Sequence, residues 1–167
     1  NASLLSPFPG YIKAINSSSI QLINAKNEQI DIQRLFDTTF LDFKVGDFID
    51  VAQPLNEGPI SPHIKLEVLF NYYKGIYSMV KACQISFKSL QLFLVSEIQR
   101  TYSSQGVSIN DKHVEVIVKQ MTSKVCIENS GNTTFLPGEM VSFQKIEALT
   151  NALNMNAEKI LTYNPVL

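Results

Sequence analysis

Asp111, His113 and Glu115 are the residues of this sequence whose types come closest to a catalytic or metal-binding cluster. Carboxylates and an imidazole together can hold a divalent cation or move a proton. On a helix, however, residues two positions apart point in roughly opposite directions, so these three side chains do not converge. The other histidine, His63, is isolated in the sequence, and two histidines without cysteine ligands make a poor zinc site. We therefore predict no catalytic residue and no metal ligand in this chain.

Other catalytic signatures are also absent from the sequence. It contains no GxSxG, Walker, GxGxxG or HExxH motif. Two-metal nucleotidyl transfer needs carboxylates that lie close together on a rigid loop. The aspartates of the first third of the chain are instead spread over predicted strands and turns, and we interpret them as solvated turn residues: Asp31, Asp37, Asp42, Asp47 and Asp50. No cofactor is expected in this segment.

The bulk composition describes a chain with a substantial core and few charges. Of its 167 residues, 45% are hydrophobic and 17% are charged, and the formal net charge is −1. No overall electrostatic attraction to nucleic acid follows from that charge, and the low charge content suits a protein surrounded by neighbours.

Cys83 and Cys126 form no CxxC pair and are expected to be reduced, buried thiols. No run reaches the ~18 apolar residues that would predict a membrane span. The start at Asn1 and the apolar last residues favour a piece of a longer polypeptide.

A small set of polar residues forms the candidate interface. Four cations on neighbouring predicted elements can contact phosphates without reading bases, and alone they would bind weakly and with strong salt dependence. The alternative is a solvated or subunit-facing surface. The candidate DNA- or subunit-facing residues are Arg100, Lys112, His113, Lys119 and Lys124.

Residues 1–60 are predicted to form short strands. Apolar and polar residues alternate in Gly10–Ile15, Ser19–Ala25 and Gln29–Gln33, with turn residues between them, and another short strand follows the turn at Gly46. We expect a small β-barrel or sandwich of the sandwich-barrel hybrid type. Biotinyl and lipoyl carrier domains use a similar barrel, but no lysine here has the exposed hairpin setting that a carrier needs.

Residues 61–167 are predicted to be helical, with a short strand near 124–129, so the expected fold class is α+β. Ser61 caps a first helix that Gly75 ends. The longest helix is predicted over residues 83–102, and two apolar faces indicate that it is buried on two sides. One face carries Phe87, Leu90, Leu94 and Ile98, and the other carries Ile85, Leu92 and Val95.

Gly106 is predicted to end the longest helix as a C-cap, and the next helix is predicted to be capped by Asn110 or Asp111. Glu115 and Lys119 have the spacing and order of a favourable ion pair. The residues expected to pack inwards are Val114, Ile117, Val118 and Met121. A last helix is predicted over 139–153, with Phe143, Ile146 and Leu153 facing inwards.

The stretch "YSSQGVSINDKHVEVIVKQMTSKV", followed by "FLPGE", closely resembles the C-terminal part of the β′ subunit of multisubunit DNA-directed RNA polymerases. The family pattern there is QGV-x-I-x-DKHIE-x-IVRQM, in which Val114 and Lys119 replace the usual isoleucine and arginine. "NEGPISPH" resembles the family's turn into a helix. The sequence is most similar to the plastid form, in which β′ is split and this half is called β″, although residues 69–82 depart from the compact bacterial pattern.

This resemblance implies a structural part of an RNA polymerase, a nucleotidyltransferase, near the jaw and the base of the clamp around downstream DNA. The segment alone is expected to be inactive, because the family's metal-binding triple-aspartate motif, which holds Mg²⁺, lies in the other part of β′. The implied partners are the β subunit, the rest of β′, the α subunit and downstream duplex DNA. Lys112 and Lys119 are expected to line the polar face of their helix. The implied location is the plastid (chloroplast), with the bacterial cytoplasm as the alternative. The competing hypothesis is a free-standing protein-binding module built on a hybrid barrel.

Overall fold

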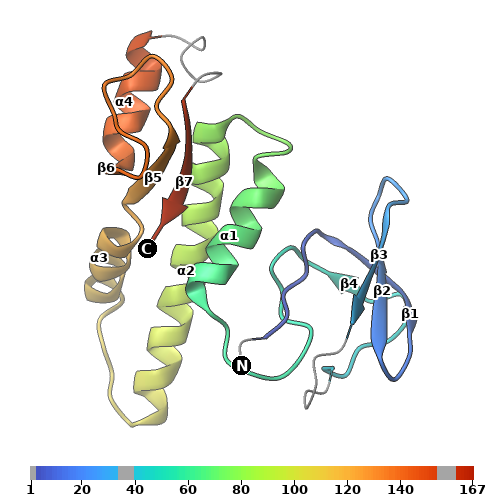
Figure 1. Ribbon diagram of the computed structural model, residues 1–167. Coiled ribbons are helices and arrows are strands. Elements are labelled where there is room, and N and C mark those ends of the chain that lie inside the picture. The colour runs from blue at the N-terminus through green and yellow to red at the C-terminus, as the bar shows by residue number, and fades with distance from the viewer. Residues whose placement is uncertain (1–2, 34–39, 154–160) are drawn as a thin grey trace. The chain divides into compact units, whose positions relative to one another are not determined.

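The computed structural model describes residues 3–33, 40–153 and 161–167. The chain forms two compact units, Asn1–Tyr72 and Tyr73–Leu167, whose elements are labelled in Figure 1. Each unit has its own antiparallel sheet, and the described residues contain four helices, so the expected α+β class is confirmed. No helix among the described residues is both long enough and apolar enough to cross a membrane.

The sheet of the first unit is built from the predicted alternating segments. Strands β1 (Gly10–Ile15), β2 (Ser19–Ile23), β3 (Gln29–Gln33) and β4 (Phe48–Ile49) pair in the order β3-β2-β1-β4. Every neighbouring pair is antiparallel, as expected for strands joined by short turns. Because side chains alternate across a strand, one face of this sheet collects the aliphatic residues.

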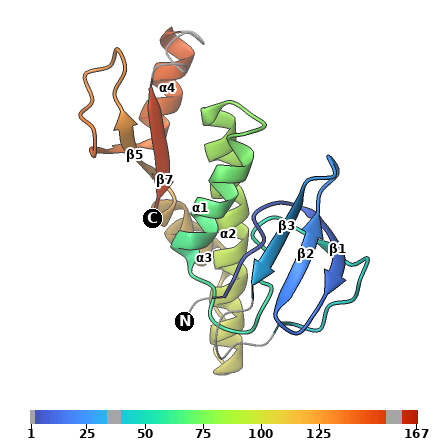
Figure 2. The same ribbon diagram turned by 45° about the vertical axis from the view of Figure 1, so that its right-hand side comes forward.

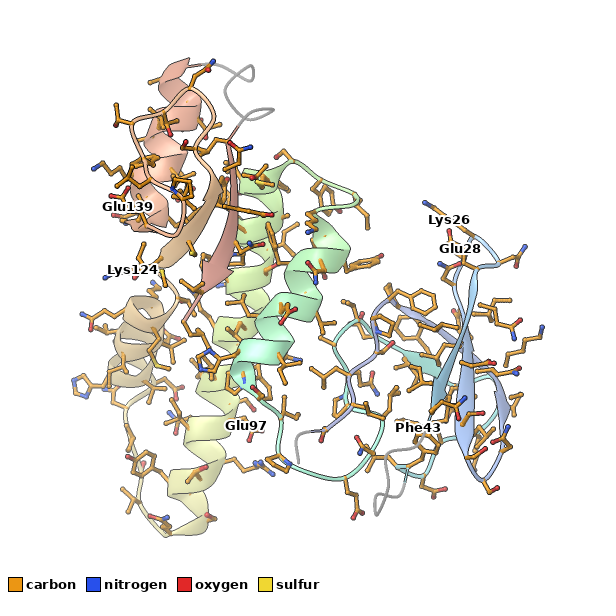
Figure 3. The ribbon with its side chains drawn as sticks, viewed as in Figure 1. Lys26, Glu28, Phe43, Glu97, Lys124 and Glu139 are labelled. Atoms are coloured by element: carbon orange, nitrogen blue, oxygen red, sulfur yellow. The ribbon has the colours of Figure 1, made fainter. Side chains whose placement is uncertain are left out.

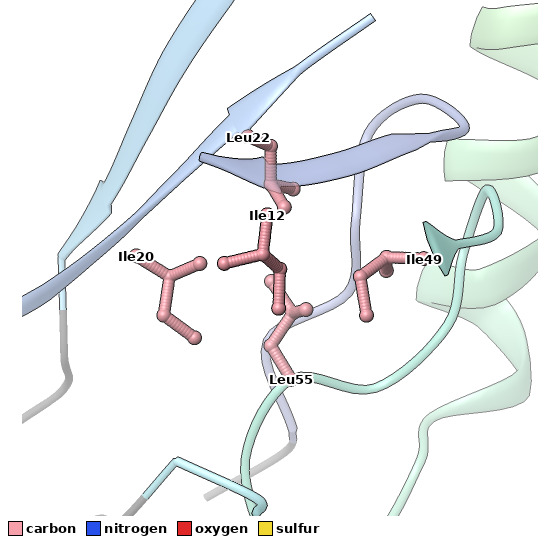
Figure 4. Packing of buried hydrophobic residues seen from close by; sticks show 5 residues of the cluster. All are labelled: Ile12, Ile20, Leu22, Ile49 and Leu55. Atoms are coloured by element: carbon pink, nitrogen blue, oxygen red, sulfur yellow. The ribbon is translucent and has the colours of Figure 1, made fainter. Parts of the chain in front are cut away.

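Five aliphatic side chains make the core of the first unit (Figure 4). Each is at most 1% exposed: Ile12, Ile20, Leu22, Ile49 and Leu55. Phe8, Ile32, Phe40 and Phe43 are partly buried against them. The described strands do not close into a barrel; beyond the sheet, isolated bridges join Leu5 to Pro54 and Phe40 to Asn56. The hybrid-barrel assignment is therefore not part of the observed fold.

Helix α1 (Pro62–Tyr73) begins where the sequence predicted. The hydroxyl of Ser61 accepts a hydrogen bond from the backbone N–H of Ile64 at 3.4 Å, and Gly75 lies in the turn that follows the helix. Lys65 donates from Nζ to the carbonyl of Ala52 at 3.0 Å, which ties the helix to the loop after β4. Burial lowers the pKa of Lys65, and the charge of Asp50 opposes that shift.

The second unit contains more strand than the sequence predicted. Its elements are α2 (Met79–Ser104), α3 (Asp111–Met121), β5 (Lys124–Asn129), β6 (Met140–Ser142), α4 (Phe143–Leu153) and β7 (Thr162–Val166). The strands pair antiparallel in the order β6-β5-β7. Strand β5 was predicted, whereas β7 was not. The helix predicted over 139–153 is wrong at its start, because residues 140–142 pair with β5 and the helix begins at Phe143. The side chain of Leu153 lies outside the described part of the chain.

Helix α2 is the longest element, and α3 and β7 lie against it (Figures 1 and 2). Ser78 caps it, so it starts earlier than the predicted residue 83, and residues 69–82 contain the end of α1, a turn and the first residues of α2. On the first predicted face, Phe87, Leu90 and Leu94 are buried as predicted, and Ile98 is half-buried. The prediction of burial on the second side is wrong at Leu92, which is 63% exposed, whereas Ile85 and Val95 are half-buried.

The end of α2 is fixed by the predicted glycine. Gly106 has φ +74°, a conformation that costs glycine little, and its N–H donates to the carbonyl of Ser103 at 3.0 Å. The N–H of Val107 donates to the carbonyl of Tyr102 at 2.9 Å. These two bonds form the Schellman arrangement, which stops the helix and turns the chain towards α3.

Gly10 allows β1 and β2 to approach closely, and its substitution tests that contact. A Cβ at Gly10 would lie 2.6 Å from the carbonyl oxygen of Ile23, so one strand must shift. We expect Gly10→Ala to lower the free energy of unfolding by about 1–3 kcal/mol in chemical denaturation. Lys13→Ala, at an exposed position on the same strand, is the control and should change it by about 0.5 kcal/mol or less. Equal effects of the two changes would contradict the close approach.

Candidate functional site

The candidate interface is centred on α3, which begins at a defined cap. Asn110 is the N-cap, and its Oδ1 accepts a hydrogen bond from the backbone N–H of Lys112 at 2.9 Å. The sequence left Asn110 and Asp111 as alternatives, and the structure selects Asn110. Asp111, in the first turn, instead accepts a hydrogen bond from Gln99 Nε2 of α2 at 2.5 Å.

Two glutamines of α2 hold the two ends of α3. Gln99 Nε2 donates to Asp111 and, at 3.3 Å, to the carbonyl of Ile109, just before α3. Gln91 Nε2 donates to Thr122 Oγ1 at 2.7 Å, just after α3. Because Gln91 meets the end of α3 and Gln99 meets its start, the two helices run antiparallel. The sequence analysis did not identify these glutamines; their separation of eight residues, which keeps them on one side of a helix, was the available signal.

Thr122 is a buried polar residue that joins α3 to α2. Its side chain is 4% exposed, and its hydroxyl donates to the carbonyl of Val118 at 2.9 Å while accepting from Gln91. One side chain therefore gives a second hydrogen bond to a carbonyl at the helix end, which also accepts the backbone N–H of Thr122 at 3.1 Å, and satisfies the amide of the neighbouring helix.

The face that α3 turns towards α2 is narrower than predicted. Val114 and Val118 are 3% and 0% exposed, so these two predictions are confirmed. Ile117 and Met121 are 55% and 42% exposed, so the prediction that they pack inwards is wrong. A helix laid along a single neighbouring helix buries only a narrow stripe, and both residues lie beside that stripe.

All five candidate interface residues are exposed, and the structure brings two of them onto one face. Lys112 and Lys119 are seven positions apart on α3, which places them about 20° from each other around the helix axis. His113 lies about 100° from Lys112 around that axis, and its side chain makes no hydrogen bond to the described residues. The predicted ion pair of Glu115 with Lys119 is not formed within the described chain.

The two remaining candidates stand on other elements. Arg100 is engaged within α2, where its guanidinium contacts Glu97 at 2.6 Å. Lys124 lies at the start of β5, two residues after Thr122 (Figure 3). Within the described residues, the ammonium groups of Lys112, Lys119 and Lys124 have no side-chain partner, whereas Arg100 is paired with Glu97.

Two adjoining depressions flank α3. The first, which we call the α2–α3 hollow, has a volume of about 140 Å³ and is lined by Lys88, Gln91, Leu92, Val95, Glu115, Val118 and Lys119. The second, of about 430 Å³, is lined mainly by residues of polar type and shares Gln91 and Lys119 with the first; its other lining residues are Gln120, Thr122, Ser123, Ser142, Phe143 and Gln144. Apolar and cationic groups therefore meet along one side of α3.

Catalytic geometry is not found among the described residues. No group of three or more histidine, cysteine or carboxylate side chains there is arranged to hold a metal ion. Asp47 and Asp50 accept hydrogen bonds from the backbone N–H groups of Lys44 and Val51, as expected for turn residues. Asp37 lies outside the described residues.

Comparison with known proteins identifies the family. The sequence matches the family described as RNA polymerase Rpb1, domain 5, over residues 65–160. The chain belongs to this family. It is 51% identical, over 99% of its length, to the DNA-directed RNA polymerase subunit beta″ of Emiliania huxleyi, and 39% identical, over 98%, to that of Cyanophora paradoxa. A third relative of the same name, from Rhodomonas salina, is 43% identical over 73% of the chain. The predicted membership in the β′/β″ family is confirmed.

This Rpb1 domain 5 chain corresponds to a small part of its relatives. It spans 13% of the length of the Emiliania huxleyi and Cyanophora paradoxa proteins and 9% of the Rhodomonas salina protein. The family match begins at Lys65, in α1, and covers α2, α3, β5, β6 and α4. The candidate interface therefore lies wholly inside the matched region.

Thr122→Val tests the joint between α2 and α3. Valine keeps the size of the side chain but removes both hydrogen bonds, which leaves the Gln91 amide and the Val118 carbonyl without these partners. We expect a loss of about 1–3 kcal/mol in the free energy of unfolding. The control is Thr101→Val. The Thr101 hydroxyl makes the same helical bond at an exposed site, so its removal should change the free energy of unfolding by about 0.5 kcal/mol or less. If Thr122→Val left the free energy of unfolding unchanged, Thr122 would not stabilise the contact between α2 and α3.

The two free cysteines are predicted to react at different rates. Burial raises the pKa of the Cys83 thiol, and the charge of Glu147 adds to that shift, so little reactive thiolate exists at pH 8. Cys126 is only half-buried. In the native protein, iodoacetamide should therefore modify Cys126 well before Cys83, as read by peptide mass; in denaturant the two rates should converge. Equal rates in the native protein would contradict the burial of Cys83.

Proposed function

We propose that this chain is an architectural part of the β″ subunit of a DNA-directed RNA polymerase. The single observation that carries the proposal is the 51% identity to a beta″ subunit over 99% of the chain. In this proposal the whole enzyme performs nucleotidyl transfer, and its Mg²⁺ is bound elsewhere. The segment contributes positioning surfaces, which agrees with a site built from helix-joining hydrogen bonds and exposed lysines.

The proposed place of the segment is the jaw and clamp base, beside downstream duplex DNA. Support comes from the exposed ammonium groups of Lys112 and Lys119 on one face of α3 and of Lys124 at its exit. Cations arranged along an element contact phosphates without reading sequence, which suits an enzyme that moves along its template. Arg100 and His113 are assigned secondary roles at subunit contacts, because Arg100 already pairs with Glu97.

The proposed partners are the β, β′ and α polymerase subunits, and the proposed location is the plastid. The relatives named beta″ come from three algae, which agrees with the plastid form of the family. We further propose that residues 1–60 form a sandwich-barrel hybrid, in which the open β3-β2-β1-β4 sheet is one part.

Charge reversal on α3 tests the proposed DNA contact. In the full-length subunit within assembled polymerase, Lys112→Glu together with Lys119→Glu should weaken binding to downstream duplex DNA. If each lysine neutralises one phosphate, the slope of log affinity against log salt should fall in magnitude by about 2. Filter binding over a salt series measures both quantities.

The matched control reverses two exposed lysines of the first unit, Lys13 and Lys26, and should leave that slope unchanged. Unaltered DNA affinity, transcription and subunit assembly in the α3 variant would refute the assignment of Lys112 and Lys119. A full-length subunit that does not copurify with the other polymerase subunits would refute the proposed function itself and favour an independent binding module.

A further inference from the structure

We propose that the α2–α3 hollow receives an aliphatic side chain, flanked by acidic residues, from another segment of the same β″ polypeptide. This inference rests on the proposed function, because it requires the chain to be part of the longer subunit. It assigns an occupant to a surface that the described fold leaves open.

The shape of the hollow fits one aliphatic side chain. Leu92 and Val95 of α2 and Val118 of α3 provide its apolar lining, and its volume is about 140 Å³. Val118 is fully buried beneath it, whereas Leu92 is 63% exposed. A single exposed leucine is common on protein surfaces. In a concave site, an exposed leucine beside two valines provides the apolar surface on which the anchor side chain of a partner can pack.

The charges around the hollow favour an acidic partner. Lys88 and Lys119 stand on opposite helices at its rim with Glu115, so the rim carries two ammonium groups and one carboxylate. None of these three side chains forms an ion pair or hydrogen bond in the part of the chain that the structure describes. The pairing of Arg100 with Glu97 on the same helix shows the contrasting case of a cation already satisfied locally. Carboxylates on either side of the anchor would complement the excess positive charge.

The same polypeptide is the favoured source because the hollow is small. Burying one aliphatic side chain provides too little free energy to hold a separate protein, which must also lose its translational and rotational freedom. A tethered segment has already lost most of that freedom and binds at a high effective concentration. The chain spans only 13% of the length of two of its relatives, so the greater part of such a subunit lies outside it and can supply the segment.

A nucleic-acid backbone fits the hollow less well. Phosphates would pair with Lys88 and Lys119 but would leave Leu92 and Val95 exposed, and Glu115 would repel them. DNA is therefore assigned to the face of α3 that carries Lys112 and Lys119, and the peptide segment to the apolar lining of the hollow, so Lys119 borders both proposed contacts.

Photo-crosslinking in the assembled polymerase tests this inference. A benzophenone amino acid replaces Leu92 in full-length β″, and the crosslinked peptides are identified by mass. We expect a crosslink to another stretch of β″ that has an aliphatic residue close to aspartate or glutamate. Leu136, which is 69% exposed on a loop away from the hollow's lining, is the matched control position and should give no such product.

The charge requirement is tested in the same crosslinkable subunit. Adding Lys88→Glu and Lys119→Glu should reduce the yield of that product by about fivefold, because two rim ion pairs become repulsive. Lys81→Glu, an exposed change on α2 outside the hollow, should not reduce it.

The other outcomes overturn the inference in distinguishable ways. A crosslink only to DNA or to a different subunit, or a yield no higher than that from position 136, refutes the proposed occupant while β″ still copurifies with the polymerase. Failure of β″ to copurify refutes the proposed function, and the inference falls with it.

Discussion

The arrangement of the second unit depends on three glutamine amides along one side of α2. Gln84 Nε2 donates to Glu147 of α4 at 2.9 Å, Gln91 donates to Thr122 at the end of α3, and Gln99 donates to Asp111 at its start. The spacings of seven and eight residues keep these amides on one side of the helix, next to its buried apolar stripe. Apolar burial alone is non-directional, so it does not fix how far one helix slides along another. Hydrogen bonds at both ends of α3 do fix that position, and with it the place of every lysine on its surface.

A second constraint lies where α3 becomes β5. Thr122 ends the helix through its bond to the Val118 carbonyl, and the next residue, Ser123, accepts a hydrogen bond from the backbone N–H of Phe143 at 2.7 Å. Phe143 is the first residue of α4, and its ring packs edge-on against Phe87 of α2 at 5.6 Å. Thr122 and Ser123 therefore mark the place where the end of α3, the start of β5 and the start of α4 are joined to α2. The polar depression beside Lys119 is a consequence of this convergence, because its walls are the ends of these elements.

The sequence predicted those features that depend on local chemistry. The alternating strands β1 and β3, the Ser61 cap, the Gly106 stop and strand β5 are set by residues within a few positions of each other. Prediction failed where a distant partner decides the structure. Residues 140–142 have a helix-like pattern but pair with β5, and β7 exists only because β5 offers its other edge. Ile117, Met121 and Leu92 were predicted to be buried from periodicity, which reports an apolar face but not whether a neighbour covers it.

These exposed apolar residues and the free lysines of α3 have a common physical explanation. The unpaired ammonium groups and the exposed leucine, isoleucine and methionine side chains do not stabilise the described fold, because they are neither paired nor buried within it. Hydrogen bonds and buried aliphatic residues already hold each element in place. In the proposed function this surface makes contacts beyond the segment, which agrees with a chain that makes up 13% of the length of two of its relatives. Hydrogen bonds from α2 hold α3 at a fixed position, and Lys119 lies both on the lysine face of α3 and at the rim of the α2–α3 hollow.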